Sequence, residues 1–219
     1  MFKFDKLALG DLGWGDELLF ATLMTITVSI LSMGLGLCLA IITVWAKLIT
    51  NRITRLIANF YTTVVRGVPE LLVIYLIFFG GNSVVMGVAK LFGYNGYIEL
   101  NSLTIGTIAI AFISATYSSE VIRAAYLAVN KGQVEAAKAL GLNKIQIFLR
   151  VMGPQIIRHA LPGIGNVWQI TLKDTSLISV TGLVEIMRQT RIASNVEHSP
   201  LTFLITAALL YLFLTTFSG

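Results

Sequence analysis

The feature that most constrains this chain is the stretch of residues 18–46, which contains no charged side chain. As an α-helix it would be about 44 Å long, because each residue adds about 1.5 Å along the axis. The hydrocarbon core of a bilayer is about 30 Å thick, so this helix is more than long enough to cross it. The stretch therefore predicts a membrane protein.

The composition of the whole chain extends this prediction. Hydrophobic residues make up 56% of the 219 residues and charged residues 12%, and the mean hydropathy is +0.81. These values exceed what a soluble core of this size needs and indicate a polytopic membrane protein. The net charge of +5 does not point to nucleic acid, because no basic stripe with interleaved aromatic residues accompanies it. Cys38 is the single cysteine and the two histidines lie far apart, so no disulfide or metal site is expected.

Apolar runs predict an all-α fold with five transmembrane helices in a single domain that covers residues 1–219. The fourth helix is the least apolar, because its uncharged core at 159–172 is short for a span and the helix must include Arg158. The predicted helices occupy about 18–46, 56–80, 100–122, 155–173 and 199–219.

The basic residues are concentrated on one side of the predicted spans. Loops rich in lysine and arginine stay in the cytoplasm. We therefore expect the segment at 47–55 and the loop at about 127–153 to be cytoplasmic, with the N-terminus outside and the C-terminus inside. Nine of the 16 basic residues lie in or beside these segments: Lys47, Arg52, Arg55, Arg123, Lys131, Lys138, Lys144, Arg150 and Arg158.

Residues 134–148, VEAAKALGLNKIQIF, form a short polar stretch within the second basic loop. Val134 to Leu140 can make two helical turns, and Gly141 supplies the left-handed residue that commonly ends a helix. A second short helix is expected to begin at Asn143. Such a helix can be received in a groove on a partner protein, or it can lie on the inner leaflet as an amphipathic helix. Physical chemistry alone leaves both alternatives open.

Small residues recur at helical spacing in two of the predicted spans. Such stripes let helix backbones approach closely in lipid, most often within one chain and otherwise at an interface with a second subunit. The two stripes are Ser32, Gly36 and Ala40, and Ala111, Ala115 and Ser119.

Four separated motifs resemble those of the permease subunits of ABC importers for polar amino acids. The segment EAAKALGLNKIQIFLRVMGPQIIRHALPGIGN resembles their cytoplasmic EAA loop, and the likeness extends over residues 18–219. The other motifs are YTTVVRGVPELLVIYLIFFG, YSSEVIRAAYLAVNKGQVEAA and WQITLKDTSLISVTGLVEI. The most similar groups are the permeases for histidine, lysine, arginine and ornithine, and those for octopine and nopaline. The EAA positions in register are Glu135, Ala136, Ala137, Gly141 and Leu161-Pro162.

This resemblance implies the type I ABC-importer permease fold and a place in the bacterial inner membrane. It implies ATP-driven import of a polar, basic amino acid or an opine. Its implied partners are an ABC ATPase dimer that receives the EAA helices, a second permease and a periplasmic substrate-binding protein. For the permease pair, the resemblance favours a heterodimer. The chain has no GxxxxGK[ST] motif, so we expect no cofactor and no enzymatic activity on it, with ATP bound by the partner.

An ion-coupled secondary transporter or channel subunit is the alternative function. Against it, the sequence shows no internal hydropathy repeat and no row of intramembrane acids suited to ion coupling. An enzyme that acts in the membrane has no support, because there is no His cluster, GxSxG motif or pair of carboxylates on one helix.

Glu70 departs from the family pattern, since many members read RGTPLL where this chain reads RGVPEL. An acid at membrane depth is costly and tends to face a cavity or a partner. Two roles stay open for it: a structural ion pair with Arg66, or contact with a cationic substrate.

Two further groups complete the candidate site residues. Glu120 and Arg123 are predicted to form an ion pair that holds the third helix to the cytoplasmic loop. Asp174, Thr175 and Ser176 follow the fourth helix in a stretch expected to be non-helical, which is tolerated at membrane depth only beside protein or a wet cavity. We therefore expect them to line the translocation path.

Overall fold

The computed structural model of the chain describes residues 4–10, 13–94, 96 and 101–218. These residues form helices and connections, and no β-strand occurs among them. The helices longer than ten residues are α1 (Gly15–Leu48), α2 (Arg52–Gly67), α4 (Gly81–Leu91), α5 (Ser102–Ala128), α8 (Gly153–Asp174), α9 (Ile186–Glu197) and α10 (Pro200–Ser218). The shorter ones are η1 (Phe4–Leu7), α3 (Glu70–Tyr75), η2 (Leu76–Gly80), α6 (Lys131–Ala139), α7 (Lys144–Ile147), η3 (Phe148–Met152) and η4 (Thr175–Thr181).

Asparagine begins four of these helices. The side chains of Asn51, Asn101, Asn130 and Asn143 each accept a hydrogen bond from a backbone N–H in the first turn of α2, α5, α6 and α7. An N-cap of this kind satisfies a donor that the helix itself leaves unpaired, and it typically stabilises the helix by about 1 kcal/mol.

Four helical segments in the described part of the chain are long and apolar enough to cross a membrane: 15–48, 70–91, 102–128 and 200–218. The helix predicted at 155–173 is present as α8, residues 153–174. Its composition does not mark it as a span, because polar residues such as Arg158, His159 and Asn166 lower its mean hydropathy.

The single helix predicted at 56–80 was wrong. The chain forms α2 up to Gly67, leaves the helical conformation at Val68 and Pro69, and starts a new helix at Glu70 that continues to Leu91. Proline disfavours the helical conformation of the residue before it and has no N–H to donate. The break places Glu70 at the start of a helix instead of in the middle of one.

The centre of the fold is the pairing of α1 with α5. A Cβ atom added at Gly36 would lie 2.1 Å from Ser114 Oγ and 3.1 Å from the Ala111 carbonyl oxygen, so the two backbones are close there. Nearby, the Ser32 hydroxyl donates to the Thr107 carbonyl at 3.1 Å. The two stripes of small residues therefore pack within the chain, which decides between the alternatives that the sequence left open.

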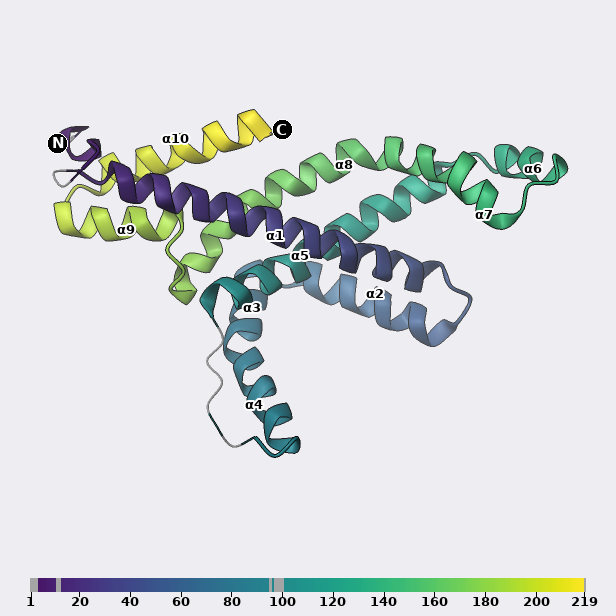
Figure 1. The fold of residues 1–219 in the computed structure, drawn as a ribbon, viewed down its shortest axis with the longest axis horizontal. Helices are drawn as coiled ribbons and strands as arrows, with labels where there is room; N and C mark the ends of the chain where they lie inside the picture. Colours follow the sequence, from purple (N-terminus) through teal and green to yellow (C-terminus); the bar gives the residue numbers. More distant parts are fainter. Residues whose placement is uncertain (1–3, 11–12, 95, 97–100, 219) are drawn as a thin grey trace.

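Figure 1 shows that the α1–α2 connection and the segment α6–α7 lie at the same end of the molecule, with the N-terminus and α9 at the other end. The two basic segments thus share one end. From this end α7, η3 and α8 follow one another without a break, so residues 144–174 form one continuous helix of about 45 Å. This helix packs closely on α5 at Gly163, where an added Cβ would lie 2.6 Å from a methyl carbon of Val121.

Candidate functional site

The EAA segment folds as two short helices joined by a tight turn. Gly141 has φ +79°, its N–H donates to the Lys138 carbonyl at 2.9 Å, and the Leu142 N–H donates to the Ala137 carbonyl at 3.2 Å. These two hydrogen bonds form a Schellman motif, which ends α6 at a residue with a left-handed backbone. Asn143 and Gln146 then form a capping box that starts α7.

This segment has one anchored side and one open side. Ala137 is buried against the chain, whereas Glu135 and Ala136 are exposed on α6. Large apolar side chains beside them are also exposed, and Leu140 is the most exposed at 81%. An exposed apolar surface of this kind marks a site for a partner protein or a membrane. The other exposed apolar residues here are Ile145, Phe148 and Leu149.

Glu70 and Asp174 lie together, although they are more than a hundred residues apart in the sequence. Glu70 begins α3 and Asp174 ends α8. The two carboxyl groups are close enough to interact electrostatically, and the Tyr117 hydroxyl on α5 donates to Glu70 Oε1 at 2.9 Å. Two adjacent acids form a local negative site, and a cation placed between them would stabilise both in the ionised form.

Arg66 does not pair with Glu70 within the residues that the structure describes. Its guanidinium lies over the ring of Tyr117, 5.4 Å from the centroid, whereas Glu70 accepts the hydroxyl of the same tyrosine. The ion pair predicted between them is therefore replaced by a shared contact with Tyr117. The break at Pro69 explains this, because it removes the helical geometry that brings residues i and i+4 together.

Thr175 and Ser176 are not in the non-helical stretch that the sequence suggested, because residues 175–181 form a 3₁₀ helix, η4. Thr175 is fully buried, and its hydroxyl donates to the Leu172 carbonyl at 2.7 Å. Ser176 is half-buried beside Asp174. Of the three predicted path residues, Asp174 is therefore the one that the fold brings to Glu70.

Glu120, one turn beyond Tyr117 on α5, binds two cations. Arg123 donates from Nε and a terminal nitrogen to Glu120 Oε2 at 3.0 and 2.8 Å. Lys47, from the last turn of α1, binds Glu120 Oε1 and donates to Thr62 Oγ1 on α2 at 2.6 Å. Lys47 is buried, so this cluster ties three helices together. The sequence had assigned Lys47 only to the basic segment predicted to be cytoplasmic.

A polar pocket of about 450 Å³ is lined in part by Glu120 of this cluster and by Tyr117, which also binds Glu70 of the acidic pair. Tyr117 and Glu120 come from α5, one turn apart, and the other lining residues come from α2. Polar side chains at membrane depth are stable when they face water or a partner. The residues lining the pocket are Thr62, Thr63, Arg66, Gly67, Tyr117 and Glu120.

Glu185 is a buried acid that the sequence did not single out. Its carboxylate accepts hydrogen bonds from the backbone N–H groups of Met187 and Arg188 at 2.8 and 2.7 Å, and from the Tyr211 hydroxyl at 2.9 Å. Burial raises the pKa of Glu185, opposed by the backbone hydrogen bonds, which lower it. Glu185 is the N-cap of α9 and joins it to α10, so its role is structural.

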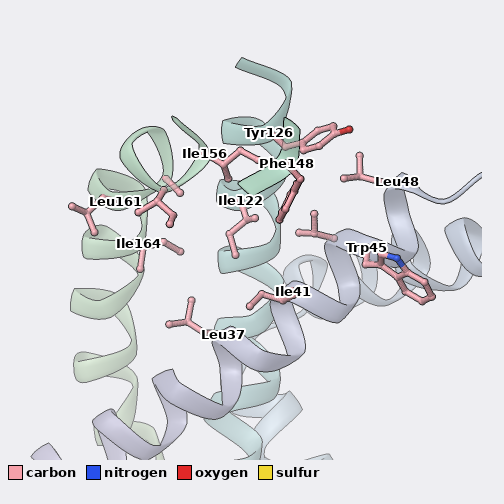
Figure 2. Close-up of a pocket in the computed structure, with 13 residues that line it drawn as sticks. Leu37, Ile41, Trp45, Leu48, Ile122, Tyr126, Phe148, Ile156, Leu161 and Ile164 are labelled. Atoms are coloured by element: carbon pink, nitrogen blue, oxygen red, sulfur yellow. The ribbon is translucent and has the colours of Figure 1, made fainter. Parts of the chain in front are cut away.

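A larger cavity of about 670 Å³ lies elsewhere, between α1, α5 and the helix formed by η3 and α8. Figure 2 shows the side chains that point into it, among them Leu37, Ile41 and Phe148. All of its lining residues are apolar or aromatic, and it contains none of the acids described above. It therefore lacks the chemistry to hold a polar or charged molecule, despite its greater volume.

Comparison with known proteins identifies the relatives of this chain. Residues 32–219 match the family described as "Binding-protein-dependent transport system inner membrane component". The chain is 50% identical to the nopaline transport system permease protein NocQ of Agrobacterium fabrum, over 97% of this chain and 91% of that protein. It is 44% identical to the octopine transport system permease protein OccQ of Rhizobium radiobacter, over 97% and 90%. It is 38% identical to the histidine/lysine/arginine/ornithine transport system permease protein HisQ of Escherichia coli, over 94% and 90%.

The solved structures agree. A crystal structure of an amino acid ABC transporter with histidines superposes with a TM-score of 0.80 and 28% identity, covering 94% of this chain and 90% of that one. An inward-facing structure of the MetNI methionine ABC transporter superposes with a TM-score of 0.66 at 16% identity, covering 91% and 88%, which shows the fold alone.

Proposed function

Because this chain belongs to the family of binding-protein-dependent transport system inner membrane components, we propose that it carries a basic amino acid or an opine inward across the membrane. It is a permease subunit of an ABC importer, which works with an ATPase and a substrate-binding protein. We further propose that the second permease is a related chain, that ATP is bound only on the ATPase, and that α6 and α7 are cytoplasmic.

The EAA segment is the proposed site of coupling to the ATPase. The supporting observation is its shape: α6 is anchored at Ala137 and presents Glu135, Ala136 and Leu140 outward. A short helix with an exposed apolar side fits a groove on a partner protein. Gly141 sets the angle between α6 and α7, so it fixes how the two helices enter such a groove.

The adjacent carboxyls of Glu70 and Asp174 carry the proposal for the substrate. Relatives of this chain transport nopaline, octopine, or histidine, lysine, arginine and ornithine. Arginine, lysine and ornithine carry a cationic side chain, and an opine of arginine keeps its guanidinium. Two acids held together at the junction of α3, α5 and α8 offer the charge that such a cation requires.

The test is uptake by the assembled importer in proteoliposomes. Glu70→Gln is expected to reduce arginine uptake at least tenfold, because a hydrogen bond to a charged group contributes about 1.5–3 kcal/mol, while the yield of the permease–ATPase complex stays unchanged. Glu17→Gln, an exposed acid near the start of α1, is the matched control and should transport normally. Unchanged uptake by Glu70→Gln would reject the acidic pair as a substrate contact. Uptake driven by an ion gradient without any ATPase would instead support the alternative class, a secondary transporter.

The orientation is tested by labelling introduced cysteines. In a background where Cys38 is replaced by serine, Asn195→Cys should react with an impermeant thiol reagent in intact cells, and Asn143→Cys should react only after permeabilisation. Both positions are exposed and lie at opposite ends of the molecule. The reverse labelling pattern would overturn the proposed cytoplasmic location of the basic segments.

A further inference from the structure

The guanidinium of Arg66 is a cation without an acidic partner in the described part of the chain, and Arg66 lines the polar pocket. Within the described residues it forms no ion pair, and its recorded contact is the face of the Tyr117 ring. Arg66 lies in the last turn of α2 and its side chain is exposed. An arginine at membrane depth is costly unless it faces water or meets an anion.

The one acid that lines the same pocket does not compensate Arg66. Glu120 is occupied by Lys47 and Arg123, which between them bind both of its carboxylate oxygens. The pocket therefore keeps a free guanidinium on one wall, and the nearby Thr63 side chain adds a hydroxyl.

Tyr117 fixes the distance between this cation and the acidic pair. Its ring face holds the Arg66 guanidinium, and its hydroxyl donates to Glu70. A positive group and a pair of acids are thus separated by a single tyrosine side chain. A molecule with a cation at one end and a carboxylate at the other has charges that complement both groups.

We propose that Arg66 is the carboxylate-binding residue of the transport site. This rests on the proposed function, in which Glu70 and Asp174 take the cationic end of the substrate. The planar guanidinium presents paired N–H donors that match the two oxygens of a carboxylate. The ligand class is then a molecule with both a cationic group and a carboxylate, which includes amino acids and opines. A simple diamine lacks the carboxylate that Arg66 would bind.

The test compares arginine with agmatine, which has the same guanidinium but no carboxylate. Binding of each is measured by displacement of radiolabelled arginine from the purified permease–ATPase complex in nanodiscs. The wild-type complex should prefer arginine. Arg66→Gln should reduce this preference about ten- to a hundredfold, the range expected for loss of a charge-assisted pair, and leave agmatine affinity unchanged. Arg66→Lys should retain part of the preference, because it keeps the charge and loses the planar fork.

The matched control is Arg55→Gln, which removes an exposed arginine from the other end of α2 and should leave the preference intact. Equal weakening of arginine and agmatine in Arg66→Gln would overturn the proposal, as would an unchanged preference or loss of the complex. Glu70→Gln separates this proposal from the proposed function, because it should weaken both ligands together. If Glu70→Gln weakens the binding of neither arginine nor agmatine, the proposed cation site at Glu70 and Asp174 is rejected. The role of Arg66 is still decided separately, by the preference for arginine over agmatine in Arg66→Gln.

Discussion

Replacing Gly141 by valine is expected to abolish ATP-dependent uptake while the chain remains inserted. The φ of +79° at this position is unfavourable for a β-branched residue. An added Cβ would meet no atom within 4 Å, so the cost is conformational and not a clash. The turn must therefore change, and α6 would no longer present Glu135 at the same angle to a partner. Uptake by the assembled importer, with protein level in the membrane as the reference, measures the effect.

Gly141→Asn is the matched control, because asparagine tolerates the left-handed conformation and should retain most of the uptake. Glu135→Arg tests the exposed side of α6 in the same assay and should also abolish uptake, since it reverses a charge on the docking side. Normal transport by both Gly141→Val and Glu135→Arg would exclude this segment as the coupling site.

Glu120→Gln is expected to destabilise the chain by about 3–5 kcal/mol, the usual cost of leaving a buried charge without its partner. The charge left behind is Lys47, whose side chain is 4% exposed; the substituted amide oxygen and the Thr62 hydroxyl can still accept its N–H groups, but neither supplies a negative charge. The loss should appear as lower thermal stability of the detergent-solubilised chain.

Arg123→Gln provides the comparison, because it breaks the other ion pair of the same acid. The Arg123 side chain is 39% exposed, so water compensates the loss and about 1 kcal/mol or less is expected. Equal destabilisation by Glu120→Gln and Arg123→Gln would show that burial of Lys47 does not set the energy of this cluster.

The sequence predicted the class of fold because hydrophobic runs carry that information locally. It also predicted the turn at Gly141 and the start of α7 at Asn143, since a glycine and a capping asparagine act on their own neighbours. It joined α2 to the helix that begins at Glu70 because the run from 56 to 80 holds few charges. The signal against this was Pro69, which breaks a helix however apolar its surroundings are.

For the site residues too, the sequence predicted what depends on neighbouring residues and missed what depends on contacts between distant helices. Glu70 and Asp174 could be singled out because acids are rare in apolar runs, but their meeting depends on the packing of α3 and α8 against α5. Tyr117 and Lys47 were missed for that reason. A tyrosine in an apolar run and a lysine at the end of a span look ordinary until their partners from other helices are known.

The continuous helix from Lys144 to Asp174 has a mechanical consequence. It begins beside the EAA turn, ends at the acidic pair, and is held against α5 near its middle, where Gly163 meets Val121. Pro162 lies next to this contact and removes a helical hydrogen bond there, so the part of the helix toward Lys144 can change its angle to the rest. The part toward Asp174 is held in place, because Leu172 and Trp168 pack against α9 and α10. A displacement of the EAA turn would therefore be taken up as a bend at Pro162, with Asp174 staying beside Glu70.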